Sequence, residues 1–209
     1  MDKNVIKPKV EEALTKKTEK KFKQSVEAVF NFKGAEMEGE HKLNIQVSLP
    51  KGRGKEVRVG FFVDGDLNVQ AKKISEFVLS KKEIEEYTKD KRKMRKFANH
   101  CYSFVAQADL MGSVGKNWGI VLGPRGKMPV PIPPKGDVEA TYNRVKDTVR
   151  VRSKKLPTVQ VPVGAEDMDA DDIAENILAV YVAVERVIPK DHIESLYVKT
   201  TMGEAVRVW

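Results

Sequence analysis

The hydrophobic pattern of the chain changes twice along its length, and this change constrains the fold more than any other feature. Near both ends, apolar residues alternate with polar ones, as in strands that bury one face. In the middle, apolar residues form short continuous runs, which are typical of strands buried on both faces of a parallel sheet. The sequence therefore predicts two structural units, one of them built from both ends of the chain.

The alternating segments predict antiparallel strands combined with helices. The expected strands cover residues 24–32, 41–50, 148–164 and 195–209. The hydrophilic stretch 33–40 is expected to join the first two strands as a long hairpin loop. Helices are expected over residues 3–20 and after Asp169, a residue type that caps helices.

The continuous apolar segments of the middle alternate with helical segments. Strands are expected at residues 56–65, 76–80 and 101–107, and helices at residues 68–74, 81–99, 109–118 and 137–146. Strands that alternate with helices indicate a parallel sheet covered on both faces. The proline- and glycine-rich stretch 123–136 is expected to be irregular.

These patterns predict a fold of mixed α/β and α+β class with two domains. Residues 1–55 and 148–209 would form a discontinuous α+β domain with antiparallel strands. Residues 56–147 would form an inserted Rossmann-like three-layer α/β domain. The glycine- and lysine-rich segment 50–56 is expected to be a hinge, and two crossings of the chain favour relative motion of the domains.

The charge balance narrows the class of partner. The 209 residues include 38 Lys and Arg against 30 Asp and Glu, which gives a net charge of +8 and a pI near 9.4. A basic surface attracts nucleic acid first, and then acidic membranes or acidic proteins. A basic pI is equally compatible with simple solubility, so charge alone does not decide the function.

Cysteine and histidine usage predicts neither a disulfide scaffold nor a metal site. Cys101 is the single cysteine, and the three histidines lie far apart in the sequence. We therefore expect no metal and no cofactor. The N-terminus has no apolar core of a signal peptide, and no apolar run approaches the roughly 18 residues of a membrane helix. A soluble intracellular protein without a membrane partner is expected.

Enzymatic alternatives have weak sequence support. None of the glycine–lysine pairs fits the phosphate-binding loop G-x-x-x-x-G-K-[ST], and G-x-G-x-x-G does not occur. The segment FFVDGDLN resembles the nucleophile motif of magnesium-dependent phosphotransferases, with Asp64 as nucleophile and Asp66 as acid. Asn68 departs from that motif, and no later acidic pair completes a metal site. The alternative is that both aspartates form a turn and cap the next helix.

Two basic segments are candidates for contact with nucleic acid. A run of six lysines and arginines lies within residues 89–96, although Glu83, Glu85 and Glu86 precede it by about one turn and could neutralise it. Residues 112–129, GSVGKNWGIVLGPRGKMP, would place Arg125 and Lys127 at the tip of a long, proline-stiffened loop.

Several segments together resemble a known family. MGSVGKNWGIVLGPRGKMPVP is similar to the signature segment of the ribosomal protein L-one family, and SLYVKTTMGEAVRV to its C-terminal strand. KKFKQSVEAVFNF, QVSLPKGRGKEVRV and VPVGAEDMDADDIAENI resemble further segments of that family in the same order. The resemblance covers nearly the whole chain and is stronger to the archaeal and eukaryotic branches than to the bacterial one.

The resemblance implies a non-enzymatic function in the cytoplasm, within the large ribosomal subunit. Members bind large-subunit (23S-type) ribosomal RNA, form a mobile stalk near the tRNA exit site, and assist tRNA release. Several repress translation by binding their own messenger RNA. The partners expected for this chain are therefore large-subunit ribosomal RNA, its own mRNA and tRNA in the exit site, and the free protein is expected to be a monomer.

The resemblance also implies which residues contact RNA. They are Phe22, Ser25, Glu27, Thr201, Met202 and Gly203. Arg125 and Lys127 are added to these candidates because of the charge that they bring to the glycine-rich segment. Hydroxyls, carboxylates and exposed backbone can bind RNA 2′-hydroxyls and base edges. Many members have proline where this chain has Glu204, so we expect that carboxylate to point away from the phosphates. Without the resemblance, Thr201, Met202 and Gly203 would be an ordinary turn.

Overall fold

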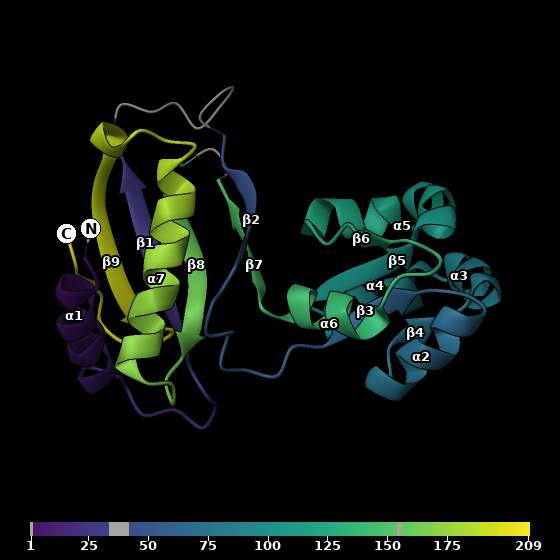
Figure 1. Ribbon diagram of the computed structural model, residues 1–209, viewed down its shortest axis with the longest axis horizontal. Helices are drawn as coiled ribbons and strands as arrows, with labels where there is room; N and C mark the ends of the chain where they lie inside the picture. The colour runs from purple at the N-terminus through teal and green to yellow at the C-terminus, as the bar shows by residue number, and fades with distance from the viewer. Residues whose placement is uncertain (1, 34–41, 154–155) are drawn as a thin grey trace. The chain divides into compact units, whose positions relative to one another are not determined.

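The computed structural model describes residues 2–33, 42–153 and 156–209. The chain divides into two compact units, Met1–Lys55 with Asp147–Trp209, and Glu56–Lys146 (Figure 1). We call them the first unit and the inserted unit. The predicted fold class, a discontinuous antiparallel α+β domain with an inserted α/β domain, is confirmed.

The first unit is built on a four-stranded sheet of order β10-β9-β1-β8. Strand β1 (Ser25–Phe32) lies in the centre, antiparallel to β8 (Thr158–Ala165) on one side and to β9 (Ile193–Thr200) on the other. Strand β10 (Val206–Arg207) pairs with β9 at the edge. Figure 1 shows β1, from the beginning of the chain, between two strands from its end.

One face of this sheet is buried by two helices, α1 (Lys3–Thr15) and α7 (Ala170–Glu185). The predicted inward residues of β1 are buried, and they are Val26, Ala28, Phe30 and Phe32. Helix α7 buries its own apolar stripe, which includes Ile173, Ile177, Val180 and Val184. Full burial of each such side chain contributes about 1.5–3 kcal/mol, so the alternating pattern decides which face of the sheet is covered.

The expected hairpin between the first two strands is wrong. Strand β2 (Asn44–Ser48) pairs with β7 (Thr148–Arg152) in a separate two-stranded antiparallel ribbon, whereas the partners of β1 among the described residues are β8 and β9. Alternation identified the strands, but it carries no information about which strand is the partner. Apart from Lys33, the residues expected to form the hairpin loop lie outside the described part of the chain.

Both crossings between the units begin at the end of the β2–β7 ribbon. The amide of Leu49 donates to the carbonyl of Asp147 over 2.9 Å. The buried amide of Asn176 on α7 accepts from the Lys51 N–H and donates to the carbonyls of Gly52 and Val163. The first crossing is therefore fixed to α7 as far as Gly52.

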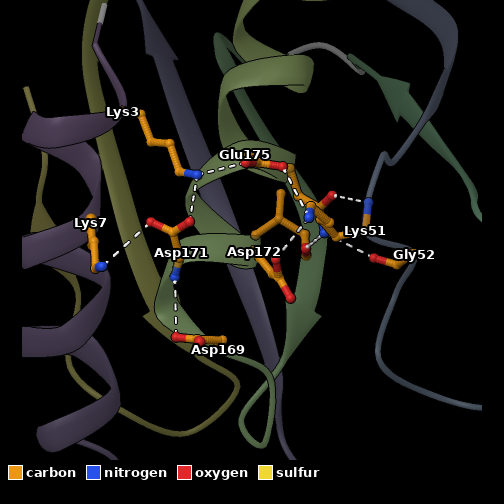
Figure 2. A network of polar contacts seen from close by, with 10 residues as sticks. Lys3, Lys7, Lys51, Gly52, Asp169, Asp171, Asp172 and Glu175 are labelled. Carbon is orange, nitrogen blue, oxygen red and sulfur yellow. Dashed lines mark hydrogen bonds and ion pairs between the residues drawn. The ribbon is translucent and has the colours of Figure 1, made fainter.

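Charged residues surround this anchor (Figure 2). The Lys51 ammonium lies 3.2 Å from Asp172 and 3.5 Å from Glu175. Lys3 of α1 contacts Asp171 and Glu175 at 2.5 and 2.6 Å. These carboxylates raise the pKa of Lys3 and Lys51. The first turn of α7 thus joins α1 to the start of the crossing.

The inserted unit is a three-layer α/β/α sandwich around a parallel sheet of order β4-β3-β5-β6. Its strands are β3 (Val59–Phe62), β4 (Val78–Leu79), β5 (Ser103–Gln107) and β6 (Val130–Ile132). Helices α2 (Asp66–Ile74) and α6 (Val138–Lys146) cover one face. Helices α3 (Lys81–Thr88), α4 (Lys91–His100) and α5 (Met111–Arg125) cover the other. Neighbouring residues Phe61 and Phe62 enter opposite cores.

Three expectations for this unit are wrong. Residues expected to form a long loop belong to α5, which continues through Pro124 to Arg125, and β6 lies within the stretch expected to be irregular. Gly126 then ends α5 in the left-handed conformation, φ 68°, which glycine adopts without strain. The single charged helix expected at residues 81–99 is two helices, because Asp90 caps a new one through the Arg92 and Lys93 amides.

Candidate nucleic-acid interface

Two segments that are distant in sequence meet at one end of the first unit's sheet. One is the turn between β9 and β10, which includes Thr201, Met202 and Gly203, and the other is the connection from α1 to β1, residues 16–24. The register of β1 and β9 pairs Val26 with Thr200, which places Ser25 beside Thr201. Six of the residues implied by the resemblance therefore belong to this part of the fold.

Gln24 joins the two segments and was not identified from the sequence. Its side chain is fully buried, its Nε2 donates to the Thr18 carbonyl over 2.6 Å, and its Oε1 accepts from the Met202 amide over 2.9 Å. The Thr18 hydroxyl donates to the Met202 carbonyl over 3.2 Å. A glutamine directly before a strand carries no local signal of such a role, because its bond to the Met202 amide depends on a residue far away in the chain.

Thr201 is bonded within the protein. Its hydroxyl accepts from the Ser25 amide over 3.0 Å and donates to the Ser25 carbonyl over 3.3 Å. Its own amide also donates to that carbonyl over 3.0 Å. The hydroxyl has one proton and uses it within the protein, so its observed role is to close the end of the sheet, and any bond to RNA would have to be one that it accepts.

Gly203 has an internal reason to be glycine. A Cβ at this position would lie 2.2 Å from the Thr200 hydroxyl oxygen and 3.3 Å from the Lys16 carbonyl oxygen. The Gly203 amide donates to the Thr200 carbonyl over 3.2 Å, which closes the turn. The missing side chain lets the turn approach residues 16 and 17, so close approach to an RNA sugar is not needed to explain it.

The outer surface of this cluster combines apolar side chains with cations. Phe22 and Met202 are 51% and 54% exposed, unusually high for such residues. Lys20 and Lys21 are exposed, and neither has an ion-pair partner in the described part of the chain. Glu204 is exposed, and its charge raises the pKa of Lys16, after the larger effect of Glu12. We call Phe22, Met202, Lys20 and Lys21 the β1-end surface.

Ser25 and Glu27 have less open positions than this surface. Both are half-buried on the sheet face opposite the helices, and Glu27 lies across from Lys199 on β9. The register of β1 against β8 shifts between Val26 and Glu27, which is a β-bulge. The extra residue of the bulge is Val163 on β8, and the alternation of buried and half-buried residues along β1 continues through Glu27.

Arg125 and Lys127 belong to the inserted unit and have partners there. The Lys127 ammonium donates to the carbonyls of Ala98 and Cys101 over 2.8 and 2.6 Å, which satisfies the end of α4. Burial lowers the pKa of Lys127. The Arg125 guanidinium bonds Asn99 and the Val121 carbonyl. Lys127 is therefore a capping residue, while Arg125 remains exposed at the end of α5.

Asp64 and Asp66 show the arrangement of a turn. Asp64 accepts from the Gly65 amide over 3.0 Å, and Asp66 lies in the first turn of α2, where a carboxylate stabilises the helix dipole. Within residues 2–33, 42–153 and 156–209, no three His, Cys, Asp or Glu side chains are grouped as metal ligands. No helix among these residues has the length and apolar character needed to cross a membrane.

Comparison with known proteins agrees with the resemblance over almost the whole chain. The profile of the ribosomal protein L1p/L10e family matches residues 14–204. Three similar relatives carry the name large ribosomal subunit protein uL1. That of Thermoplasma acidophilum is 40% identical over 100% of this chain and 97% of its own length. That of Methanothermobacter thermautotrophicus is 44% identical over 90% of both chains.

The third relative, from Archaeoglobus fulgidus, is 38% identical over 100% of this chain and 99% of its own length. All three organisms are archaea, which agrees with the branch that the sequence resembled. The similarity extends over both segments of the first unit and over the inserted unit. The chain therefore belongs to the ribosomal protein L1p/L10e family.

Proposed function

We propose that this ribosomal protein is a structural component of the large ribosomal subunit and binds its RNA through the β1-end surface. One observation supports this site above others. Phe22 and Met202 are held outward among lysines by segments that the buried Gln24 fastens together. Exposed aromatic and thioether side chains can pack on bases or riboses, while lysines neutralise phosphates.

The alternative of a magnesium-dependent phosphotransferase is discarded. The family consists of ribosomal proteins and not of enzymes, which confirms the expectation for the chain as a whole. Asp64 and Asp66 have the local roles described above.

The proposal extends to two further RNA partners that the family resemblance suggests. The chain's own messenger RNA would compete for the β1-end surface if it carries a fold like that of the ribosomal site. tRNA leaving the exit site would be the partner of the assembled stalk. An excess of the messenger's leader should displace a ribosomal RNA fragment from the free protein, and simultaneous binding of both RNAs would contradict a shared site.

Substitution of Met202 tests the ribosomal RNA site. Met202→Asp places a carboxylate against phosphates and should weaken binding of a large-subunit RNA fragment at least tenfold, with little change in Tm because the side chain is exposed. Phe22→Ala should cost about 1–3 kcal/mol if the ring stacks on a base. Both are measured by fluorescence anisotropy with labelled RNA.

Val5→Asp is the matched control, because Val5 is 52% exposed on α1 and receives the same new charge. This control should bind like the parent. Parent-like binding by Met202→Asp and Phe22→Ala together would reject the β1-end surface. Equal loss in Val5→Asp and Met202→Asp would mean that net charge alone sets the affinity.

A further inference from the structure

The positive charge of the chain is concentrated outside the unit that carries the proposed RNA site. Residues 56–146 contain 17 Lys and Arg against 11 Asp and Glu, a balance of +6. The remaining residues contain 21 against 19, a balance of +2. Most of the excess positive charge therefore belongs to the inserted unit. RNA binding at the β1-end surface of the first unit does not explain this charge.

Helix α4 carries the densest part of this charge. Its ten residues include five cations and no carboxylate, and all five cations are exposed. They are Lys91, Arg92, Lys93, Arg95 and Lys96. Met94 and Ala98 are buried against the core of the inserted unit. At 100° per residue, Arg92 and Lys96 lie on the side of the helix turned away from those two residues, and Arg95 lies on its flank.

The cations of α4 are not neutralised by neighbouring acids. The sequence allowed the glutamates of residues 83–86 to pair with them, but the chain starts a new helix at Asp90 and separates the two groups. Glu83 instead bonds the Ser80 amide and hydroxyl at 2.7 Å. Within the described part of the chain, no carboxylate lies within 4.0 Å of a cationic nitrogen of α4.

Such an arrangement is unfavourable in the isolated protein. Arg92 and Lys96 are like charges four residues apart, as are Lys91 and Arg95, and such pairs destabilise a helix. Asp90 at the N-cap offsets part of this repulsion, and its pKa is lowered by the Arg92 and Lys93 amides first and by their charges second. An anion bound along the helix would relieve the remainder.

A second element extends the same surface. The Nε of Arg125, at the end of α5, donates to the Asn99 side chain over 3.2 Å. Asn99 is exposed on α4 and lies at the same side of the helix as Arg92 and Arg95. We call the five α4 cations together with Arg125 the α4 basic face.

We propose that the α4 basic face binds the phosphate backbone of an RNA segment other than the one held by the β1-end surface. This inference rests on the proposed function for its ligand class. The centre of the face has no exposed large apolar residue, as a specific protein interface would require. Arginines pair with phosphates in a bidentate manner, and an array without base-reading pockets binds without sequence preference.

The test uses the full chain and an RNA hairpin of unrelated sequence with about 16 base pairs, a length that spans two grooves. The variant Arg92→Ala, Arg95→Ala, Lys96→Ala removes three charges and keeps helix propensity. The matched control Lys72→Ala, Lys73→Ala, Lys135→Ala removes three exposed charges of the same unit elsewhere. Affinity is measured by anisotropy from about 50 to 200 mM salt.

The α4 variant should bind the hairpin about tenfold more weakly at about 100 mM salt, and its slope of log affinity against log salt should fall by roughly two. The control should change affinity less than twofold. Equal losses in both variants would overturn the proposal in favour of diffuse attraction, as would failure of the parent to bind the hairpin. Binding of poly-glutamate that depends on α4, without binding of the hairpin, would identify an acidic protein as the partner.

A large-subunit RNA fragment separates this inference from the proposed function. If Met202→Asp no longer binds the large-subunit fragment but still binds the hairpin, two separate surfaces are supported. If the parent does not bind the large-subunit fragment yet binds the hairpin through α4, the proposed function is rejected and the α4 basic face is supported. If the parent binds the fragment and the α4 variant matches its control on the hairpin, only the inference fails.

Discussion

At the scale of single residues, the candidate interface depends on side chains whose polar groups are already satisfied inside the protein. The family resemblance led to Thr201, Met202 and Gly203, but it did not say which of them faces outward. The structure separates them, because Thr201 and Gly203 close the turn while Met202 is exposed. The role of Gln24 could not be predicted, since two of its partners, Glu166 and Met202, lie on segments far away in the sequence.

Thr201→Val should therefore lower the stability of the folded protein, and its main effect should not be a direct loss of RNA binding. Loss of the hydroxyl leaves the Ser25 amide without this acceptor, which should lower the free energy of unfolding by about 1–3 kcal/mol. Urea denaturation followed by circular dichroism measures the change. Thr141→Val, which loses a hydroxyl bonded within an exposed helical turn, is the control and should be nearly neutral. Unchanged stability in Thr201→Val would contradict the structural role.

Cys101 should be unreactive in the folded protein. Burial raises the pKa of its thiol to about 12, against 9.0 as the ordinary value, although Lys127 and Arg58 act in the opposite direction. Labelling with a thiol reagent at pH 8 should then follow unfolding of the inserted unit. Because the thiol of the folded protein has the higher pKa, the unfolded chain loses this proton first as the pH rises above 9. The stability contributed by the buried, protonated Cys101 is therefore complete below pH 9 and is lost as the pH rises towards 12. Rapid labelling of native protein at pH 8 would contradict this picture.

At the scale of helices and strands, local sequence predicted the elements better than their limits and partners. Helix α5 contains four glycines and a proline, which have low helix propensity, yet burial of Trp118 and Leu122 holds it in place. Strand β6 was missed because Pro131 removes a donor, which an edge strand tolerates. The partner of β2 depends on β7, about a hundred residues away in sequence, and no local signal encodes it.

The anchor of the first crossing on α7 gives a prediction at this scale. Asn176→Ala leaves the Lys51 amide and the carbonyls of Gly52 and Val163 without their partner, in a position with no exposed surface. The free energy of unfolding of the first unit should fall by about 2–4 kcal/mol. Lys51→Ala removes only solvent-exposed ion pairs at the same place and should have a small effect. Similar effects in both variants would show that the ion pairs, not Asn176, hold the crossing.

At the scale of the whole molecule, the change of hydrophobic pattern was the informative signal. It placed the beginning of the insertion at about residue 56 and its end at about residue 147, and in the structure Glu56–Lys146 is a compact unit of its own. Each unit has its own core, apart from the other's. The layers of each sheet followed from periodicity, whereas strand order required long-range packing.

Removal of the insertion should leave the first unit folded. Leu49 bonds Asp147, and a Cβ at Gly52 would lie 3.0 Å from the Asp147 carboxylate, so the chain runs close to its point of return three residues before the cut. A short Gly-Ser linker in place of residues 56–146 should give a protein with one cooperative thermal transition that still binds a large-subunit RNA fragment. A molten product would reject the boundary. A folded product without RNA binding would place the site in the insertion.

The central position of β1 has a consequence for biosynthesis. Both neighbours of β1, which are β8 and β9, are translated after the whole inserted unit. Strand β1 therefore lacks its partner strands while more than a hundred residues are added to the chain. The inserted unit is contiguous and can fold as it leaves the ribosome. The turn at Met202 also follows the inserted unit in the sequence, so it can join Gln24 only after that unit has been made. A nascent chain therefore displays the basic helix α4 well before it can form the β1-end surface.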